Sequence, residues 1–138
     1  MEKEKIIEKV KDAARGVSED HGNIIAVYLY GSFVEGNEDE RSDIDIAILF
    51  DDYKLQELLE VGRKIQERAG VSREVDVRAL NSSDSQFAFR VVKDAVLLYE
   101  KDREKRADME QSMERKYHDM KPYVREYRDE MKRRVKNG

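Results

Sequence analysis

Residues 24–50, IIAVYLYGSFVEGNEDERSDIDIAILF, contain two apolar stretches separated by a polar segment. The first, Ile24–Tyr30, is a continuous run of β-branched, aromatic and other apolar residues, which is typical of a buried strand. In the second, Ile44–Phe50, every other side chain is large and apolar, so these side chains share one face of a strand. The sequence therefore predicts two strands joined by a polar loop over residues 31–42.

The segments that follow and precede these strands alternate between helical and strand patterns. Apolar residues recur at helical spacing over residues 2–16 and about 53–69, and a glycine near the end of each segment is expected to stop the helix. Glu74–Leu80 and Ala95–Tyr99 have the pattern of short strands, and Ser82–Asp84 is expected to cap a helix between them. Strands that alternate with helices at this pace predict an α/β fold, with one small sheet covered by helices.

Composition narrows the class of protein. The chain has 138 residues, no Cys and only two His, which excludes a disulfide framework, Cys-ligated zinc and a thiolate nucleophile. No apolar run approaches the ~20 residues that cross a membrane, and the amino terminus lacks the apolar region of a secretory signal. We therefore expect a cytoplasmic protein with no membrane partner. The net charge of −4 makes nucleic acid an unlikely partner.

The last 38 residues differ from the rest of the chain. Residues 101–138 hold 13 Lys and Arg against 9 Asp and Glu, whereas residues 1–100 hold 14 against 22. We expect the core and a first domain within residues 1–100, followed by a helical extension that Pro122 kinks or splits in two. One apolar stripe on this helix recurs every three or four residues: Met113, Tyr117, Met120, Val124, Tyr127 and Met131. The stripe suits packing on the chain's own domain, and it equally suits a partner or an oligomer seam.

The polar loop between the first two strands begins and ends with residues suited to phosphate chemistry. Gly31 and Ser32 follow the first strand directly. Glycine lets a backbone come close to a phosphate, and the serine offers a hydroxyl and an N–H to its oxygens. Ten residues further on, Asp43 and Asp45 project from one face of the second strand. Paired carboxylates at the mouth of a strand suit a magnesium ion, so nucleotide phosphates would fit between the two ends of the loop.

A third acidic residue, Asp76, lies between two valines in the middle of the next predicted strand. A charge in such an apolar setting needs a partner. If this strand lies beside the second one, Asp76 points into the same cleft as Asp43 and Asp45, ligates a second metal and accepts the proton of an attacking hydroxyl. Arg78 shares the face of Asp76 and is the basic residue best placed to meet a carboxylate or a triphosphate.

Other interpretations of the paired carboxylates fit less well. An EF-hand needs a third oxygen ligand two residues further on, followed by glycine, and Ala47 and Ile48 occupy those positions. A Walker A loop and a Gly-x-Gly-x-x-Gly fingerprint are both absent from the sequence. What makes the pattern specific is therefore the combination of Gly-Ser, ten intervening residues, Asp-x-Asp and an Asp in a later strand.

At these residues the sequence resembles the minimal nucleotidyltransferase (MNT) domains of the DNA polymerase β-like superfamily. The stretches GSFVEGNEDERSDIDIAILF and EVDVRAL match in spacing and order, and the resemblance covers roughly residues 5–100. It implies a small mixed β-sheet covered by helices, with ATP as substrate and two magnesium ions. The residues expected to be catalytic and to hold the metal are Asp43, Asp45 and Asp76. Those expected at the nucleotide are Gly31, Ser32, Arg41, Ser42 and Arg78.

The resemblance also implies a biological role. Many MNT domains are antitoxins paired with a HEPN ribonuclease toxin, some silence the toxin by transferring AMP to one of its tyrosines, and the long final helix looks like their extension. It therefore implies a magnesium-dependent nucleotidyltransferase that moves AMP or another NMP from NTP to a protein hydroxyl, on a HEPN toxin. Two alternatives stay open. One is a catalytically inactive antitoxin that neutralises its partner by contact, and the other is a nucleotidyltransferase that modifies a small molecule such as an antibiotic.

Overall fold

The two apolar stretches form β1 (Ile24–Tyr30) and β2 (Ile44–Phe50), side by side in a computed structural model that describes residues 2–36, 39 and 42–137. With β3 (Val75–Ala79) and β4 (Val96–Glu100) they build a four-stranded sheet of order β3-β2-β1-β4. β2 pairs with β3 in parallel, whereas β1 runs antiparallel to both β2 and β4. The predicted small mixed sheet is therefore confirmed.

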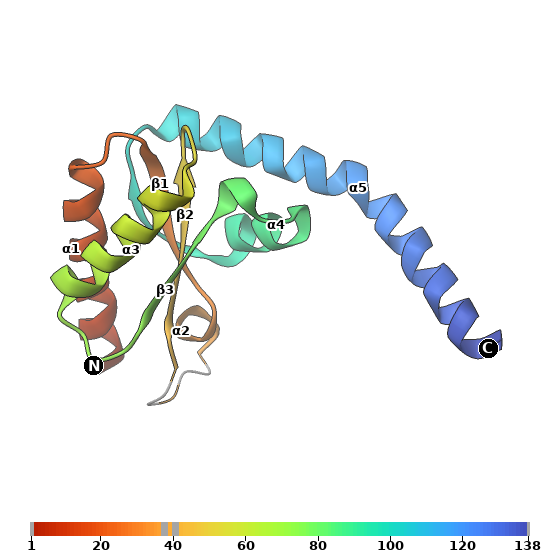
Figure 1. The fold of residues 1–138 in the computed structure, drawn as a ribbon, viewed down its shortest axis with the longest axis horizontal. Helices are drawn as coiled ribbons and strands as arrows, with labels where there is room; N and C mark the ends of the chain where they lie inside the picture. Colours follow the sequence, from red (N-terminus) through yellow and green to blue (C-terminus); the bar gives the residue numbers. More distant parts are fainter. Residues whose placement is uncertain (1, 37–38, 40–41, 138) are drawn as a thin grey trace.

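Helices cover both faces of this sheet (Figure 1). The helical elements are α1 (Glu2–Glu19), α2 (Ser32–Glu35), α3 (Leu55–Ala69), the 3-10 turn η1 (Leu80–Ser82), α4 (Ser85–Asp94) and α5 (Arg103–Asn137). The helices α1 and α3 pack on one face, while α4 and the beginning of α5 pack on the other. The α/β class and the long final helix are as predicted.

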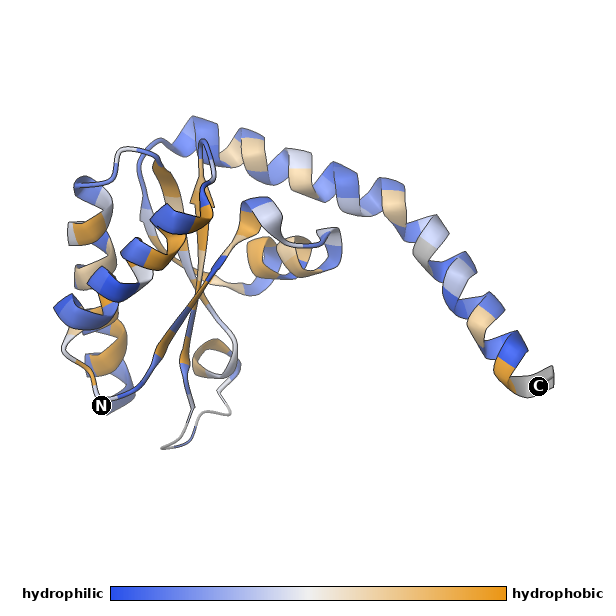
Figure 2. Ribbon diagram, in the orientation of Figure 1, coloured by the Kyte–Doolittle hydropathy of each residue, from blue (hydrophilic) through white to orange (hydrophobic). Residues whose placement is uncertain are grey.

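Alternation along β2 explains how both faces become apolar. Ile44, Ile46 and Ile48 point toward α1 and α3, whereas Ala47 and Leu49 point toward α4. Orange, apolar positions accordingly follow the strands and the helix faces that cover them (Figure 2). All five of these β2 side chains are at most 1% exposed, so burying them supplies much of the driving force for folding, about 25 cal/mol per Å² of apolar surface.

The expected end of the first helix is wrong. α1 does not stop at Gly16 but continues to Glu19. A Cβ on Gly16 would lie 2.6 Å from the Arg68 guanidinium, so the glycine gives α3 room beside α1 and does not end the helix. The buried apolar residues that the structure describes lie within residues 1–100, as expected. Met109 and Met113 of α5 are partly buried and pack against the cluster between the sheet and α4.

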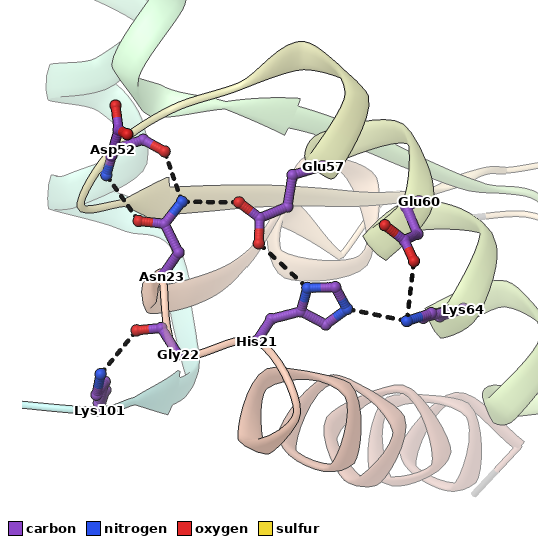
Figure 3. A network of polar contacts seen from close by, with 8 residues as sticks. All are labelled: His21, Gly22, Asn23, Asp52, Glu57, Glu60, Lys64 and Lys101. Carbon is purple, nitrogen blue, oxygen red and sulfur yellow. Dashed lines mark hydrogen bonds and ion pairs between the residues drawn. The ribbon is translucent and has the colours of Figure 1, made fainter.

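A network of polar side chains fastens the beginning of β1 to α3, at the end of the sheet far from the polar loop (Figure 3). Asn23 Nδ2 donates to the Asp52 carbonyl at 2.5 Å and to Glu57 Oε1 at 2.7 Å, and Asp52 N donates to Asn23 Oδ1 at 2.8 Å. His21 lies between Glu57 Oε2 and Lys64 Nζ, with its ring nitrogens 3.1 Å from each. His21 is thereby held in a structural network.

The first half of α5 is bound to the domain. Tyr28 Oη donates to Glu110 Oε1 at 2.6 Å, beside the apolar cluster between the sheet and α4. Further along the helix, the Tyr117 ring stacks on Phe89 of α4, with ring centroids 4.2 Å apart and planes 6° from parallel. The first part of the apolar stripe on α5 therefore packs on its own domain.

The second half of α5 extends away from the domain. The helix bends along its length (Figure 1), and Pro122 lies inside it without ending it. Proline removes one helical hydrogen bond and crowds the preceding turn, so a bend is its ordinary consequence. Every described side chain from His118 to Val135 is exposed. None of the helices in the described part of the chain is both long enough and apolar enough to cross a membrane.

Candidate active site

One row of side chains crosses three strands next to the polar loop. In the sheet register Tyr30 of β1 lies opposite Asp45 of β2, and Asp45 lies opposite Asp76 of β3. Residues in register on adjacent strands project to the same face of a sheet, and here it is the face that carries α4. The sequence left open whether the third strand lies beside the second; the structure pairs them, with Asp76 next to Asp45.

The carboxylates of this row repel one another. Burial raises the pKa of Asp45, the negative charges of Asp76 and Asp43 raise it further, and the Arg78 guanidinium opposes them. Asp43 precedes β2 and is exposed, while Asp45 is half-buried. Such an excess of negative charge fits a divalent cation, which prefers oxygen ligands. In the described residues, however, no group of three or more His, Cys, Asp or Glu side chains is gathered closely enough to hold a metal ion.

The Gly31–Ser32 turn packs directly on Asp45. Gly31 has φ 81° and ψ −150°, and a Cβ built on it would lie 2.3 Å from Asp45 Oδ2. Ser32 begins α2, in which the backbone N–H groups of Val34 and Glu35 both donate to the Gly31 carbonyl at 3.0 Å. The glycine backbone thus lies against a carboxylate, beside the place where the sequence predicts nucleotide phosphates.

The expectation that Asp76 is a buried charge in need of a partner is wrong. β3 is an edge strand of the described sheet, and Asp76 and Arg78 are both exposed, whereas Val75 and Val77 face the core and are half-buried. An exposed carboxylate is solvated by water, so burial gives no reason for an acid at this position. Its place opposite Asp45 is what distinguishes it.

The other end of the loop is held by hydrogen bonds around Ser42, whose nucleotide contact stays a prediction. Ser42 Oγ accepts a hydrogen bond from Asp39 N at 2.9 Å, and the Ser42 carbonyl accepts one from Arg73 Nη1 at 3.1 Å. Arg73 also donates to the Asp39 carbonyl and lies over the Phe33 ring, with its Cζ 5.0 Å from the ring centroid. Ser42 is thus engaged in a turn that Arg73 fastens to β3. The predicted nucleotide contact of Arg41 lies outside the described residues.

A cleft of about 280 Å³ opens beside the row, between the end of β1, α2 and α4. Arg78 and Arg90 bring positive charge to it, Glu35 and Asp94 bring negative charge, and Tyr30 and Phe87 supply aromatic surface. The rings of Tyr30 and Phe87 meet edge to face, with centroids 5.2 Å apart, and Arg78 Cζ lies 5.3 Å from the Phe87 centroid. Sequence reasoning found Arg78 but missed Phe87 and Arg90. Asp84 caps α4, and Phe87 and Arg90 follow it three residues apart, so they lie on one face of that helix. This spacing points to the cleft only once α4 is known to cover this face of the sheet.

Tyr30 stands where the cleft meets the carboxylates. Burial raises its pKa to about 12, Arg78 opposes this rise, and Asp45 and Asp76 add to it. The phenol is therefore neutral at physiological pH and can donate a hydrogen bond. Tyr30 and Arg78 thus lie next to the carboxylates of Asp45 and Asp76, and such a mixture of donors and acceptors can accommodate an anionic ligand with a bound cation.

The fold and the paired carboxylates beside a Gly-Ser turn define a small nucleotidyltransferase domain. Residues 8–104 match the family described as polymerase beta, nucleotidyltransferase. This match spans most of the chain, which therefore belongs to that family. No curated protein sequence matches the chain.

Several solved structures are similar in fold. A toxin–antitoxin crystallised with AMP-PNP superposes with a TM-score of 0.69 at 21% identity, over 91% of this chain and 97% of that one. The complex of a tri-AMPylated HEPN toxin with its MNT antitoxin from Shewanella oneidensis gives 0.71 at 18% identity, over 91% and 98%. The toxin–antitoxin MntA–HepT gives 0.63 at 20% identity, over 91% and 96%. At these identities the likeness establishes the fold alone.

Proposed function

We propose that this protein is an antitoxin that transfers AMP from ATP, with magnesium, to a hydroxyl of a HEPN toxin and so neutralises it. The observation that carries the proposal is the pairing of Asp45 with Asp76 across parallel strands, against the Gly31–Ser32 turn. Among the proteins of similar fold, one was crystallised with AMP-PNP and another belongs to a complex whose toxin is tri-AMPylated. Those ligands and modifications belong to those proteins and support the proposal by likeness of fold.

The proposed reaction is a displacement at the α-phosphorus of ATP. The acceptor oxygen forms a bond to the α-phosphorus while the bond between the α-phosphorus and the bridging oxygen breaks, and pyrophosphate leaves. The hydroxyl proton passes to a base in the site. Asp76 is proposed as that base, because it is exposed to an incoming acceptor and lies next to Asp45.

The chain's own groups are proposed to position the nucleotide. The N–H groups and hydroxyl at the Gly31–Ser32 turn bind phosphate oxygens, since the first N–H groups of a helical turn have no partner within it. Arg78 contacts the phosphates from the opposite side, and the cleft beside Tyr30 takes the rest of the nucleotide. Asp43, Asp45 and Asp76 would hold magnesium with their carboxylates turned toward the ion, since in the described residues they are not gathered that closely. Bound there, it would lower the pKa of the attacking hydroxyl and neutralise pyrophosphate.

The test is transfer of α-labelled ATP to purified toxin. The acceptor is a HEPN protein sought among the gene neighbours of this protein and purified, and the enzyme is compared as wild type, Asp45→Asn and Asp52→Asn. Asp52 is exposed and lies just past the other end of β2, and only its backbone groups hydrogen-bond to the Asn23 side chain. Asp52→Asn therefore controls for the loss of one negative charge beside the same strand. We expect wild type and Asp52→Asn to label the toxin, and Asp45→Asn to lose at least ~100-fold in rate.

Two results would contradict the proposal. If wild type transfers no label to the toxin from any of the four nucleoside triphosphates, the transfer reaction is wrong. If Asp45→Asn fails to transfer label but neutralises the toxin as well as wild type does, contact alone explains the antitoxin effect. Circular dichroism and thermal unfolding of each variant confirm that the fold is intact.

A further inference from the structure

The free half of α5 carries an apolar row that nothing in its own domain covers. This row, the distal stripe, consists of Met120, Tyr127, Met131 and Val135. Their exposed fractions are 48%, 65%, 43% and 81%, respectively. Their spacing puts them on one face of the helix. Because α5 leads this face away from the domain (Figure 1), it is accessible along its whole length, and a contiguous exposed apolar surface of this kind marks an interaction site.

Cations line the edge of the distal stripe. Lys121, Arg125, Arg128 and Lys132 follow one another at intervals of four, three and four residues, which places them in a single row beside the stripe. Among the residues whose side chains the structure describes, none forms an ion pair with a member of this basic row. Their positive charge is therefore available to a partner.

The basic row also forms a wall of a groove. The groove has a volume of about 290 Å³ and lies between α5 and the beginning of α4, where Ser85 and Gln86 line its other side. All four cations border it, and Tyr117 and Met120 give it an apolar floor next to the distal stripe. Asp129 is the only acidic residue among those that line this groove in the described part of the chain. The groove and the stripe together suit a ligand that is apolar along one line and acidic beside it.

Charge decides between the possible occupants. In an antiparallel pairing of two copies through the distal stripe, the same flanking positions of both helices face each other, so Lys121 and Arg128 would meet cations of the second copy. In a parallel pairing, Lys121 would face Lys116 of the second copy. A polynucleotide would meet the cations but also approach residues 1–100, which hold 22 acidic against 14 basic residues. A protein helix with acidic flanks pairs with the basic row, and its apolar side chains also cover the distal stripe, which a polynucleotide backbone does not do.

We propose that the distal half of α5 binds an acidic amphipathic helix of a partner protein. Apolar side chains of that helix cover the distal stripe, and its carboxylates pair with the basic row along the groove. The inference deepens the proposed function, on which it rests for the existence of a protein partner, by naming the chemistry of the partner's surface. It does not depend on nucleotide transfer.

The test uses the full-length protein and two fluorescent helical peptides. Both peptides carry leucine at the two core positions of each heptad, and they differ only in having glutamate or lysine at the flanking positions. Fluorescence anisotropy measures their binding without nucleotide or magnesium. We expect the glutamate peptide to bind at least ~10-fold more tightly than the lysine peptide, with an affinity that falls as salt rises.

Two double variants test the location. Lys121→Glu/Arg128→Glu reverses the charge beside the distal stripe. We expect it to weaken binding of the glutamate peptide at least ~10-fold and to bind the lysine peptide more tightly instead. Arg115→Glu/Arg133→Glu makes the same change in net charge on the opposite side of the same helix, where both side chains are exposed. This control is expected to bind within about threefold of wild type.

Several outcomes would overturn the inference. Equal binding of the two peptides, or an equal loss in both double variants, would remove the role of the basic row. A dimer in light scattering that Met120→Glu/Met131→Glu dissolves would assign the face to a second copy. Tighter binding of a single-stranded RNA, lost in Lys121→Glu/Arg128→Glu, would assign it to nucleic acid. Because no nucleotide chemistry is involved, failure here is separate from failure of the transfer assay.

Discussion

The substitution Gly31→Ala tests the contact between the turn after β1 and the Asp45 carboxylate. Gly31 has φ 81° and ψ −150°, a region that residues with a Cβ occupy at a cost of about 1–3 kcal/mol. The new methyl group would also lie 2.3 Å from Asp45 Oδ2 and 3.1 Å from its Cγ, so the carboxylate has to leave its rotamer, at about another 1 kcal/mol. We expect the free energy of unfolding to fall by about 2–4 kcal/mol in total.

Urea unfolding followed by circular dichroism measures this loss, and Gly36→Ala is the matched control. Gly36 also has a positive φ, of 80°, but nothing among the described atoms lies within 4 Å of its Cβ position. Its substitution carries only the backbone cost, about 1 kcal/mol. The Asp45→Ala background removes the colliding oxygen and leaves a Cβ at 3.3 Å, so Gly31→Ala is expected to cost about 1 kcal/mol less there.

Two measurements would refute this account of the turn. One is an equal cost for the alanine variants of Gly31 and Gly36. The other is a cost of Gly31→Ala that stays the same in the presence and absence of the Asp45 carboxylate. Either result would mean that the turn and β2 are not in contact as the structure describes.

Three further predictions concern stability. Without metal, Asp45→Asn is expected to raise the free energy of unfolding at pH 7 by about 0.5 kcal/mol, because the pKa of Asp45 is raised in the fold, by burial first. The gain should fade as the pH falls through the raised pKa of Asp45 and be absent below about 4, where Asp45 is protonated in both states; a gain that grows with acid would contradict the sign. Asn81→Ala is expected to cost about 2–3 kcal/mol in urea unfolding, since Asn81 donates to the Phe50 carbonyl at 2.8 Å and accepts from Phe50 N at 2.9 Å. Tyr28→Phe, which removes the 2.6 Å bond to Glu110, is expected to lower the thermal midpoint and to cost about 1–2 kcal/mol; an unchanged midpoint would rule out a stabilising role for this bond.

The sequence predicted the central strands well because their pattern is dense. β1 and β2 span the same residues as their predicted stretches, since unbroken or alternating β-branched residues leave few other conformations. The neighbouring strand β3 was also predicted at the right place in the sequence, but the exposure of Asp76 was not predicted. Whether a strand lies at an edge depends on the order of strands in the sheet, and that order is a property of the whole chain.

The candidate site was predictable in its acidic half and not in its basic and aromatic half. Gly31, Asp45 and their spacing are a local signal, whereas Phe87 and Arg90 reach the cleft only because α4 crosses this face of the sheet. The final helix shows the same limit. Its apolar stripe has one period throughout, but Tyr117 packs against Phe89 while Tyr127 is 65% exposed, and only the bend of the helix away from the domain separates the two.

The pairing of β2 with β3 has a consequence for how the protein folds. These parallel strands are joined by the crossover helix α3, and parallel pairing across such a connection is a slow, non-local folding event. A slip of one residue would bring Val75 or Val77 opposite Asp45 and turn Asp76 to the other face. A molecule with the wrong register would keep the same overall fold and lack the pair of Asp45 and Asp76. The appearance of transferase activity during refolding would therefore report when β2 and β3 pair in the correct register.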